Sequence, residues 1–85
     1  MFYYVYILRS IKFPNEIYVG YTINLKERFP LHQKGLVRST KPYRPWKIIF
    51  CEAYISKVDA KRREKYLKTA KGKKALKLML QDSLK

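Results

Sequence analysis

Arg28 and His32 carry side chains that can bind a phosphate and move a proton. They stand four residues apart in a segment with helical spacing, so both side chains can reach the same space. An arginine can hold a phosphate through two N–H donors, and a histidine can exchange a proton near neutral pH. A lone histidine near a helix end is nevertheless more often solvated or packed than catalytic.

Tyr6 and Tyr18 are candidate partners for this pair. Each lies in an apolar, aromatic segment typical of a strand, and the register of two neighbouring strands can bring their hydroxyl groups together. Cross-strand packing of the two rings is the alternative explanation.

Glu64 is a carboxylate on the inward stripe of a predicted helix, which it shares with Ala60 and Leu67. Burying an unpaired charge is costly, so this side chain needs a partner. One partner is Lys68, four residues on, in an exposed ion pair. The other is Mg²⁺, which takes one or two carboxylates and leaves its remaining positions to water and phosphate. Both alternatives stay open from the residues alone.

A small α/β sheet with helices packed on it is expected to position these side chains. Residues 2–10, 17–21 and 46–55 are rich in β-branched and aromatic residues and predict three strands, the first two paired antiparallel because their connection is short. Helices are predicted over residues 25–34, 57–70 and 73–85, which gives the order ββαβαα. Alternation along the first strand places Tyr6 and Leu8 on one face and Val5 and Ile7 on the other.

Four residues mark where these elements begin, bend or end. Asn24 can cap the first helix, and Gly35 is well placed to end it. Pro30 lacks a backbone N–H, so a kink, or a short helix with a distorted middle, is expected there. Gly72 is expected to interrupt the helical stretch that follows residue 57. Trp46 is expected to anchor the core at the start of the third strand.

The charge of the chain indicates a polyanionic partner. Twenty Lys and Arg residues against six Asp and Glu residues give a formal net charge of +14 over 85 residues. Like charges oppose compaction, and nucleic acid is the leading candidate to neutralise them. A membrane partner is not expected, because the basic residues are spread along the chain and no segment approaches the length of a bilayer span. With a single cysteine and hence no internal disulfide, a cytoplasmic location is the default expectation.

Several motifs resemble the GIY-YIG nuclease superfamily, especially its small, free-standing bacterial members. They are "YVY" at 4–6, "YVG" at 18–20, Arg28, His32 ahead of Gly35, "RPWKIIFCE" at 44–52 and "RREKYLKTAKG" at 62–72. The likeness covers nearly the whole chain. It implies one domain over residues 1–85, with a three-stranded antiparallel sheet flanked by helices (α+β). It also implies an endonuclease that hydrolyses DNA phosphodiester bonds with Mg²⁺ or Mn²⁺, is structure-selective and acts in repair or recombination. No organic cofactor is implied.

The resemblance also implies a role for each candidate residue. Tyr18 acts as general base or aligns the attacking water, and Tyr6 supports it. Arg28 stabilises charge on the phosphate, and His32 assists proton transfer or phosphate binding. Glu64 holds the metal ion. Gly20 lets backbone approach the site closely.

Residue 4 is Tyr where the family name has Gly, a departure that the likeness to close relatives tolerates. Two other departures lower the expected activity: Pro30 disturbs the helix that carries Arg28 and His32, and the last helix offers no clear match to an expected Asn. The chain is expected to bind DNA through its own basic surface, formed by Lys34, Arg38, Lys41, Arg44, Lys47, Lys61, Arg62 and Lys68. The alternative functions are a non-catalytic DNA- or RNA-binding protein on the same scaffold and a basic ribosome-associated protein.

Overall fold

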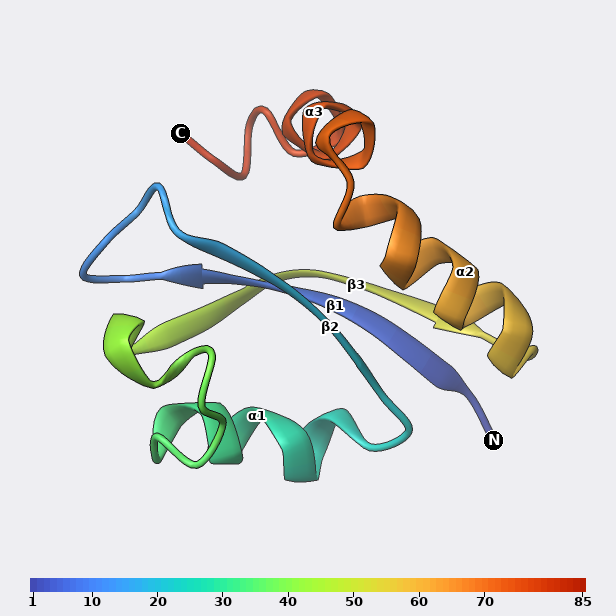
Figure 1. Cartoon of the computed structure of the whole chain (residues 1–85), viewed down its shortest axis with the longest axis horizontal. Coiled ribbons are helices and arrows are strands. Elements are labelled where there is room, and N and C mark those ends of the chain that lie inside the picture. Colours follow the sequence, from blue (N-terminus) through green and yellow to red (C-terminus); the bar gives the residue numbers. More distant parts are fainter.

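The computed structural model describes residues 1–85 and has the predicted order ββαβαα. The strands form one antiparallel sheet in the order β2-β1-β3, with β1 in the centre (Figure 1). Helix α1 covers one face of the sheet, and α2 and α3 lie over the other. The elements are β1 (Tyr3–Ser10), β2 (Ile17–Thr22), α1 (Leu25–Gln33), the short 3-10 helix η1 (Lys41–Tyr43), β3 (Trp46–Tyr54), α2 (Lys57–Leu67) and α3 (Ala70–Met79).

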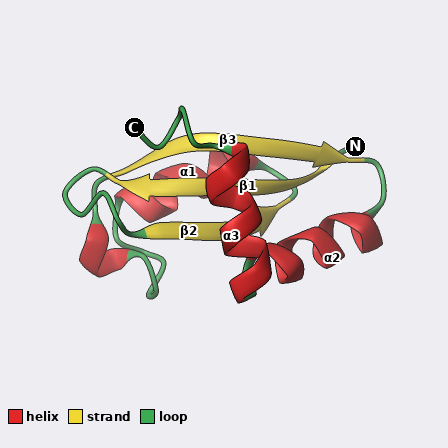
Figure 2. Cartoon of the chain, turned by 90° about the horizontal axis from the view of Figure 1, so that it is seen from above, coloured by secondary structure: helices red, strands yellow, loops and turns green.

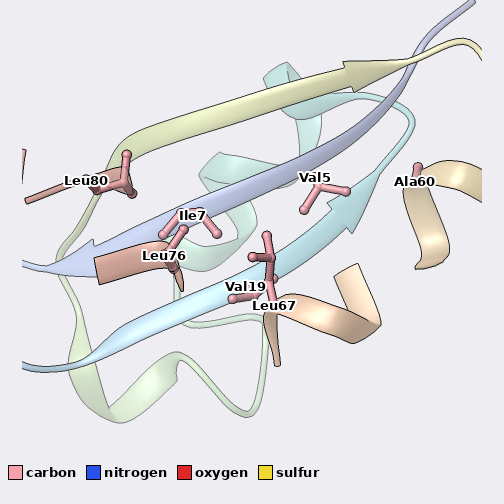
Figure 3. Packing of buried hydrophobic residues seen from close by; sticks show 7 residues of the cluster. All are labelled: Val5, Ile7, Val19, Ala60, Leu67, Leu76 and Leu80. Carbon is pink, nitrogen blue, oxygen red and sulfur yellow. The ribbon is translucent and has the colours of Figure 1, made fainter. Parts of the chain in front are cut away.

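The central strand β1 is buried on both faces and builds two cores. Val5 and Ile7 point toward α2 and α3, where they meet Val19, Leu67 and Leu76 (Figure 3). Tyr6 and Leu8 point toward α1 and pack with Trp46. The predicted alternation along this strand is therefore confirmed, as is the role of Trp46 as a core anchor.

Helix α1 begins and ends as the sequence predicts but is not broken at Pro30. The Asn24 side chain accepts a hydrogen bond from the Glu27 backbone N–H at 3.2 Å, and Gly35, with φ +75°, follows the helix end. The nine-residue helix continues through Pro30 without a break, and the expected kink stays a prediction. Pro30 is exposed, and its carbonyl still accepts from the Lys34 N–H at 3.0 Å, so one missing hydrogen bond is tolerated.

The junction between α2 and α3 lies at Thr69, and the predicted interruption at Gly72 is wrong. The Thr69 hydroxyl donates to the Tyr66 carbonyl at 2.6 Å and accepts from the Gly72 N–H at 3.0 Å, so it caps α3. Gly72 then lies inside the first turn, where a Cβ would overlap the Tyr66 carbonyl. The glycine is needed for close helix packing and does not end a helix.

Tethers between α1 and β3 fix the loop that joins them. The Gln33 side chain donates to the Trp46 carbonyl at 2.8 Å and accepts from the Trp46 N–H at 2.7 Å. The Trp46 indole N–H donates to the Thr40 carbonyl at 3.0 Å. Thr40 is thereby held under α1. No helix in the structure is long and apolar enough to cross a membrane.

Candidate active site

Four of the five residues predicted to be catalytic meet on the α1 face of the sheet. Tyr6 comes from β1, Tyr18 from β2, and Arg28 and His32 from α1. The ring centroids lie 6.3 Å apart for Tyr6 and Tyr18, 5.7 Å for Tyr6 and His32, and 5.1 Å for Tyr18 and His32. The cross-strand packing of the two rings is thus present, beside the polar side chains of Arg28 and His32.

Gly20 makes room for the Tyr6 ring. The two residues are opposite each other in the β1–β2 register. A Cβ at residue 20 would lie 2.7 Å from Tyr6 Cε1 and closer still to Cζ and the hydroxyl oxygen. The space over this glycine is therefore filled by Tyr6, whereas the sequence led us to expect a close approach of backbone to the site.

Hydrogen bonds link Tyr6, His32 and Thr40 in a chain in which each residue donates to the next. The Tyr6 hydroxyl lies 2.7 Å from His32 Nε2, and His32 Nδ1 lies 2.8 Å from Thr40 Oγ1. Thr40 donates its single hydroxyl proton to the Val37 carbonyl at 3.2 Å. Thr40 must then accept from a protonated His32 Nδ1, which leaves Nε2 to accept from the Tyr6 hydroxyl.

The protonation states of the two buried groups agree with this direction. Burial raises the pKa of Tyr6 to about 12; the Arg28 guanidinium opposes the rise, and negative charge on Tyr18 and Glu64 adds to it. Burial and the nearby Arg28 charge lower the pKa of His32 to about 4. Tyr6 is therefore a neutral donor and His32 a neutral acceptor at pH 7. Because His32 is fully buried, it does not contact a phosphate, and only a positioning or proton-transfer role remains for it.

The lowered pKa of His32 predicts a loss of stability in mild acid. The unfolded chain, with a histidine pKa near 6.5, binds more protons than the folded chain between that pH and about 4, so stability falls as the pH decreases through this window. Between pH 7 and pH 5 the loss is expected to be about 2 kcal/mol. Urea unfolding of the wild type and of His32→Gln at both pH values measures it. An equal pH dependence in the two proteins would contradict the assignment.

Arg28 presents a donor that the protein itself does not use. Its Nε atom is shielded from solvent and has no hydrogen-bond partner, although buried donors are normally paired. The Tyr6 hydroxyl is the main cause that raises the pKa of Arg28, and Tyr18 adds to the effect, so the guanidinium faces both phenols. The residue as a whole is only half-buried, so other N–H groups of its guanidinium can meet an anionic oxygen.

Glu64 lies on α2, over the face of the sheet opposite the α1 cluster (Figure 1). Its side chain is only 16% exposed, so it does not point into bulk solvent. Its charge contributes to the raised pKa of Tyr6, which lies on the other face of the sheet. Its two oxygens also pair with Lys68 at 3.1 Å and Lys61 at 3.4 Å, so the ion pair considered from the sequence is present as well.

The residues present fit a metal ion held by a single carboxylate. No group of three or more His, Cys, Asp or Glu side chains is arranged to bind a metal. Mg²⁺ is commonly held by one or two carboxylates with water and substrate phosphate as further ligands. Lys61 and Lys68 have half-exposed side chains that are free to turn away from the Glu64 oxygens when a metal ion and a phosphate arrive.

The residues predicted to bind nucleic acid are all exposed but differ in their contacts. On α2, Lys61 and Lys68 pair with Glu64, and Arg62 pairs with Asp59 at 3.3 Å. Arg44 Nε donates to the Lys41 carbonyl at 3.0 Å. The remaining residues form no ion pair within the chain: Lys34, Arg38, Lys41 and Lys47.

Thr40 and Gln33 were not identified as contributors to the site from the sequence. Thr40 stands in a basic, proline-containing loop, where a hydroxyl residue would be expected on the surface. It is fully buried because the loop folds back under α1 and closes over His32. A helix-end glutamine bonded to both backbone groups of a strand residue is likewise visible only in three dimensions.

Comparison with known proteins gives consistent similarities. The family model described as GIY-YIG catalytic domain matches residues 2–77. A UPF0213 protein of Staphylococcus haemolyticus is 36% identical over 77 residues, which cover 89% of this chain and 92% of that protein. A UPF0213 protein of Clostridium perfringens is 32% identical over 83 residues, covering 96% and 87%. The solution NMR structure of a UPF0213 protein of Bacillus halodurans matches with a TM-score of 0.58 and 29% identity, over 93% of this chain and 85% of that one.

Proposed function

The chain belongs to the GIY-YIG family, whose catalytic domain suggests a nuclease-like function, and on this premise we propose that it is a divalent-metal-dependent DNA endonuclease. The proposal treats residues 1–85 as one catalytic domain. The observation that carries it is the half-buried guanidinium of Arg28 beside two phenols, with the largely buried carboxylate of Glu64 on α2 as the candidate metal ligand. A net charge of +14 supports a polyanionic substrate.

In the proposed mechanism, this chain's residues address the two difficulties of phosphodiester hydrolysis. Water is a poor nucleophile, and Tyr18 would align it or accept its proton. The phosphate is negatively charged, and Arg28 would stabilise the charge that builds on its oxygens. Glu64 would hold Mg²⁺ or Mn²⁺, which when bound supplies Lewis-acid stabilisation of that same charge.

Tyr6, His32 and Thr40 would act as positioning residues in this mechanism. Since His32 accepts from the Tyr6 hydroxyl, the lone pairs of the Tyr6 oxygen are free to face Arg28. A neutral phenol held in this way orients the guanidinium without neutralising its charge. The Thr40 hydroxyl keeps His32 in the tautomer that this arrangement requires.

A non-catalytic DNA- or RNA-binding protein is the second candidate. The observation that favours it is that both Glu64 oxygens already pair with lysines in the free chain. If those pairs persist on nucleic acid, Glu64 neutralises lysine charge and holds no metal ion. The two candidates share salt-sensitive binding and differ in whether a strand is cut.

Cleavage of defined DNA substrates tests the proposal. Single-stranded, duplex, nicked and branched DNA are incubated with the purified protein in Mg²⁺, Mn²⁺ or EDTA. We expect strand scission only with a metal ion, strongest on nicked or branched DNA if the protein acts in repair or recombination. Glu64→Gln, purified in parallel, controls for contaminating nucleases. Salt-sensitive binding without scission of any substrate would reject the nuclease and favour the second candidate.

A further inference from the structure

Strand β2 forms an open edge of the sheet next to the candidate active site. The strand order leaves its outer side without a strand partner. Seen from above, α3 crosses over the sheet and α2 lies beside the β2 edge (Figure 2). Side chains from both helices can therefore line this edge on the α2 and α3 face, whereas the Tyr18 side chain lies on the opposite face of the same strand.

Lysines from the two helices lie at both ends of β2. The Lys61 ammonium is 4.3 Å from the centroid of the Tyr21 ring, near the end of the strand. Lys73 and Lys77 line a hollow together with Ile17 and Val19, near its start. The strand rises roughly 13 Å from residue 17 to residue 21. This length accommodates more than one phosphate of a DNA strand that runs along the edge.

The charges of Lys73 and Lys77 are not neutralised within the protein. Both side chains are exposed and form no ion pair, and α3 contains no acidic residue. They stand four residues apart, where like charges on a helix repel each other. Glu16 lines the same hollow but forms no ion pair with them. A bound phosphate backbone would relieve this repulsion.

We propose that Lys61, Lys73 and Lys77 form a phosphate-binding row, the β2-edge row, that guides one DNA strand along this edge toward Glu64, the candidate metal ligand, with which Lys61 pairs at 3.4 Å. The inference rests on the proposed function, for which it supplies the path of the substrate. It adds two α3 residues that the sequence analysis did not assign to DNA binding. It also predicts that a lysine on α3 contributes to DNA binding only if it lies on the side that faces the β2 edge, whatever the net charge.

The same helix supplies a matched control. Lys71 and Lys74 are exposed, form no ion pair and do not line the hollow at the β2 edge. Lys74 stands halfway between the buried residues Gly72 and Leu76, which places it on the outer side of α3. Replacing this pair changes the net charge as much as replacing Lys73 and Lys77.

The test compares the variants K73A/K77A and K71A/K74A. Their binding to a labelled DNA duplex is measured in EDTA over a range of salt concentrations. The first variant is expected to bind about tenfold more weakly than the wild type, and the second at most about threefold. In K73A/K77A, the slope of log affinity against log salt concentration should be shallower by about 1.8, because each of the two lost phosphate contacts contributes about 0.9. Urea unfolding verifies that both variants fold, as expected for alanine in a helix.

Equal losses in the two variants would overturn the row, because net charge alone would then explain binding. Wild-type affinity in K73A/K77A would also overturn it, as would a wild-type protein that binds no DNA. The binding assay contains no metal and needs no cleavage. Wild-type protein that binds through the row but cuts nothing rejects only the proposed function. A wild type that cuts DNA, with unaltered binding in K73A/K77A, rejects only the row.

Discussion

Glu64→Gln is expected to lower metal-dependent DNA cleavage by about 10³-fold or more, while DNA binding stays equal or becomes tighter. Glutamine keeps the size of the side chain but is a poor ligand for Mg²⁺, and no carboxylate cluster is present to replace it. The change also removes a negative charge and frees Lys61 and Lys68 for phosphate. Single-turnover cleavage and binding in EDTA, measured on the same DNA, separate the two effects.

Asp59→Asn is the control for this substitution. Asp59 lies on the same helix and forms a comparable ion pair with Arg62, but its side chain is 54% exposed. Exposed pairs contribute at most about 1 kcal/mol, so folding and cleavage should both remain close to wild type. A similar loss of cleavage in Asp59→Asn, or retained cleavage in Glu64→Gln, would show that no metal ion acts through residue 64.

Most elements of the fold follow from local sequence signals, namely the alternation of apolar residues in strands and the capping residues of helices. Strand alternation puts Val5 and Tyr6 on opposite faces, and the Asn24 side chain caps α1 as its position predicts. Pro30 and Gly72 are the exceptions. In both cases the helix continues through the residue: α1 tolerates the missing backbone hydrogen bond at Pro30, and Gly72 is required because a Cβ there would overlap the Tyr66 carbonyl.

Only those parts of the candidate site that depend on helical spacing and strand register could be predicted from the sequence. The four-residue spacing brings Arg28 and His32 together, and the β1–β2 hairpin brings Tyr6 and Tyr18 together. The burial of His32 depends on the loop that carries Thr40, and no local pattern encodes where that loop folds. Glu64 illustrates the same limit, because the ion pair with Lys68 is present and the alternative role as a metal ligand stays a prediction.

Gly20 connects the fold to the site, because the position of Tyr6 depends on it. In a strand interior, Gly→Ala would normally stabilise by roughly 0.5–1 kcal/mol, since glycine loses more backbone freedom on folding. Here the added methyl group would overlap a ring that is fully buried and bonded to His32. The backbone preference therefore predicts that Gly20→Ala stabilises the protein, whereas the contact with Tyr6 predicts that it destabilises the protein.

Gly20→Ala is expected to destabilise the protein by about 1–5 kcal/mol, after the gain in backbone preference is subtracted. Overpacking contributes roughly 1–3 kcal/mol, and the displaced Tyr6 hydroxyl leaves His32 Nε2 buried without a donor, which costs about 1–3 kcal/mol more. Urea unfolding followed by circular dichroism measures the difference. Cleavage should fall as well, because the Tyr6 hydroxyl would no longer lie beside Arg28.

A double-mutant cycle with Tyr6→Leu assigns the cause of this destabilisation. Leucine lacks the distal ring atoms and the hydroxyl that the new methyl group would meet, so Gly20→Ala in that background should be neutral or slightly stabilising. The coupling between the two positions would then exceed about 1 kcal/mol, well above the error of additivity for independent sites. Additive effects would mean that the methyl group is accommodated without moving Tyr6, and that Gly20 does not determine where the phenol lies.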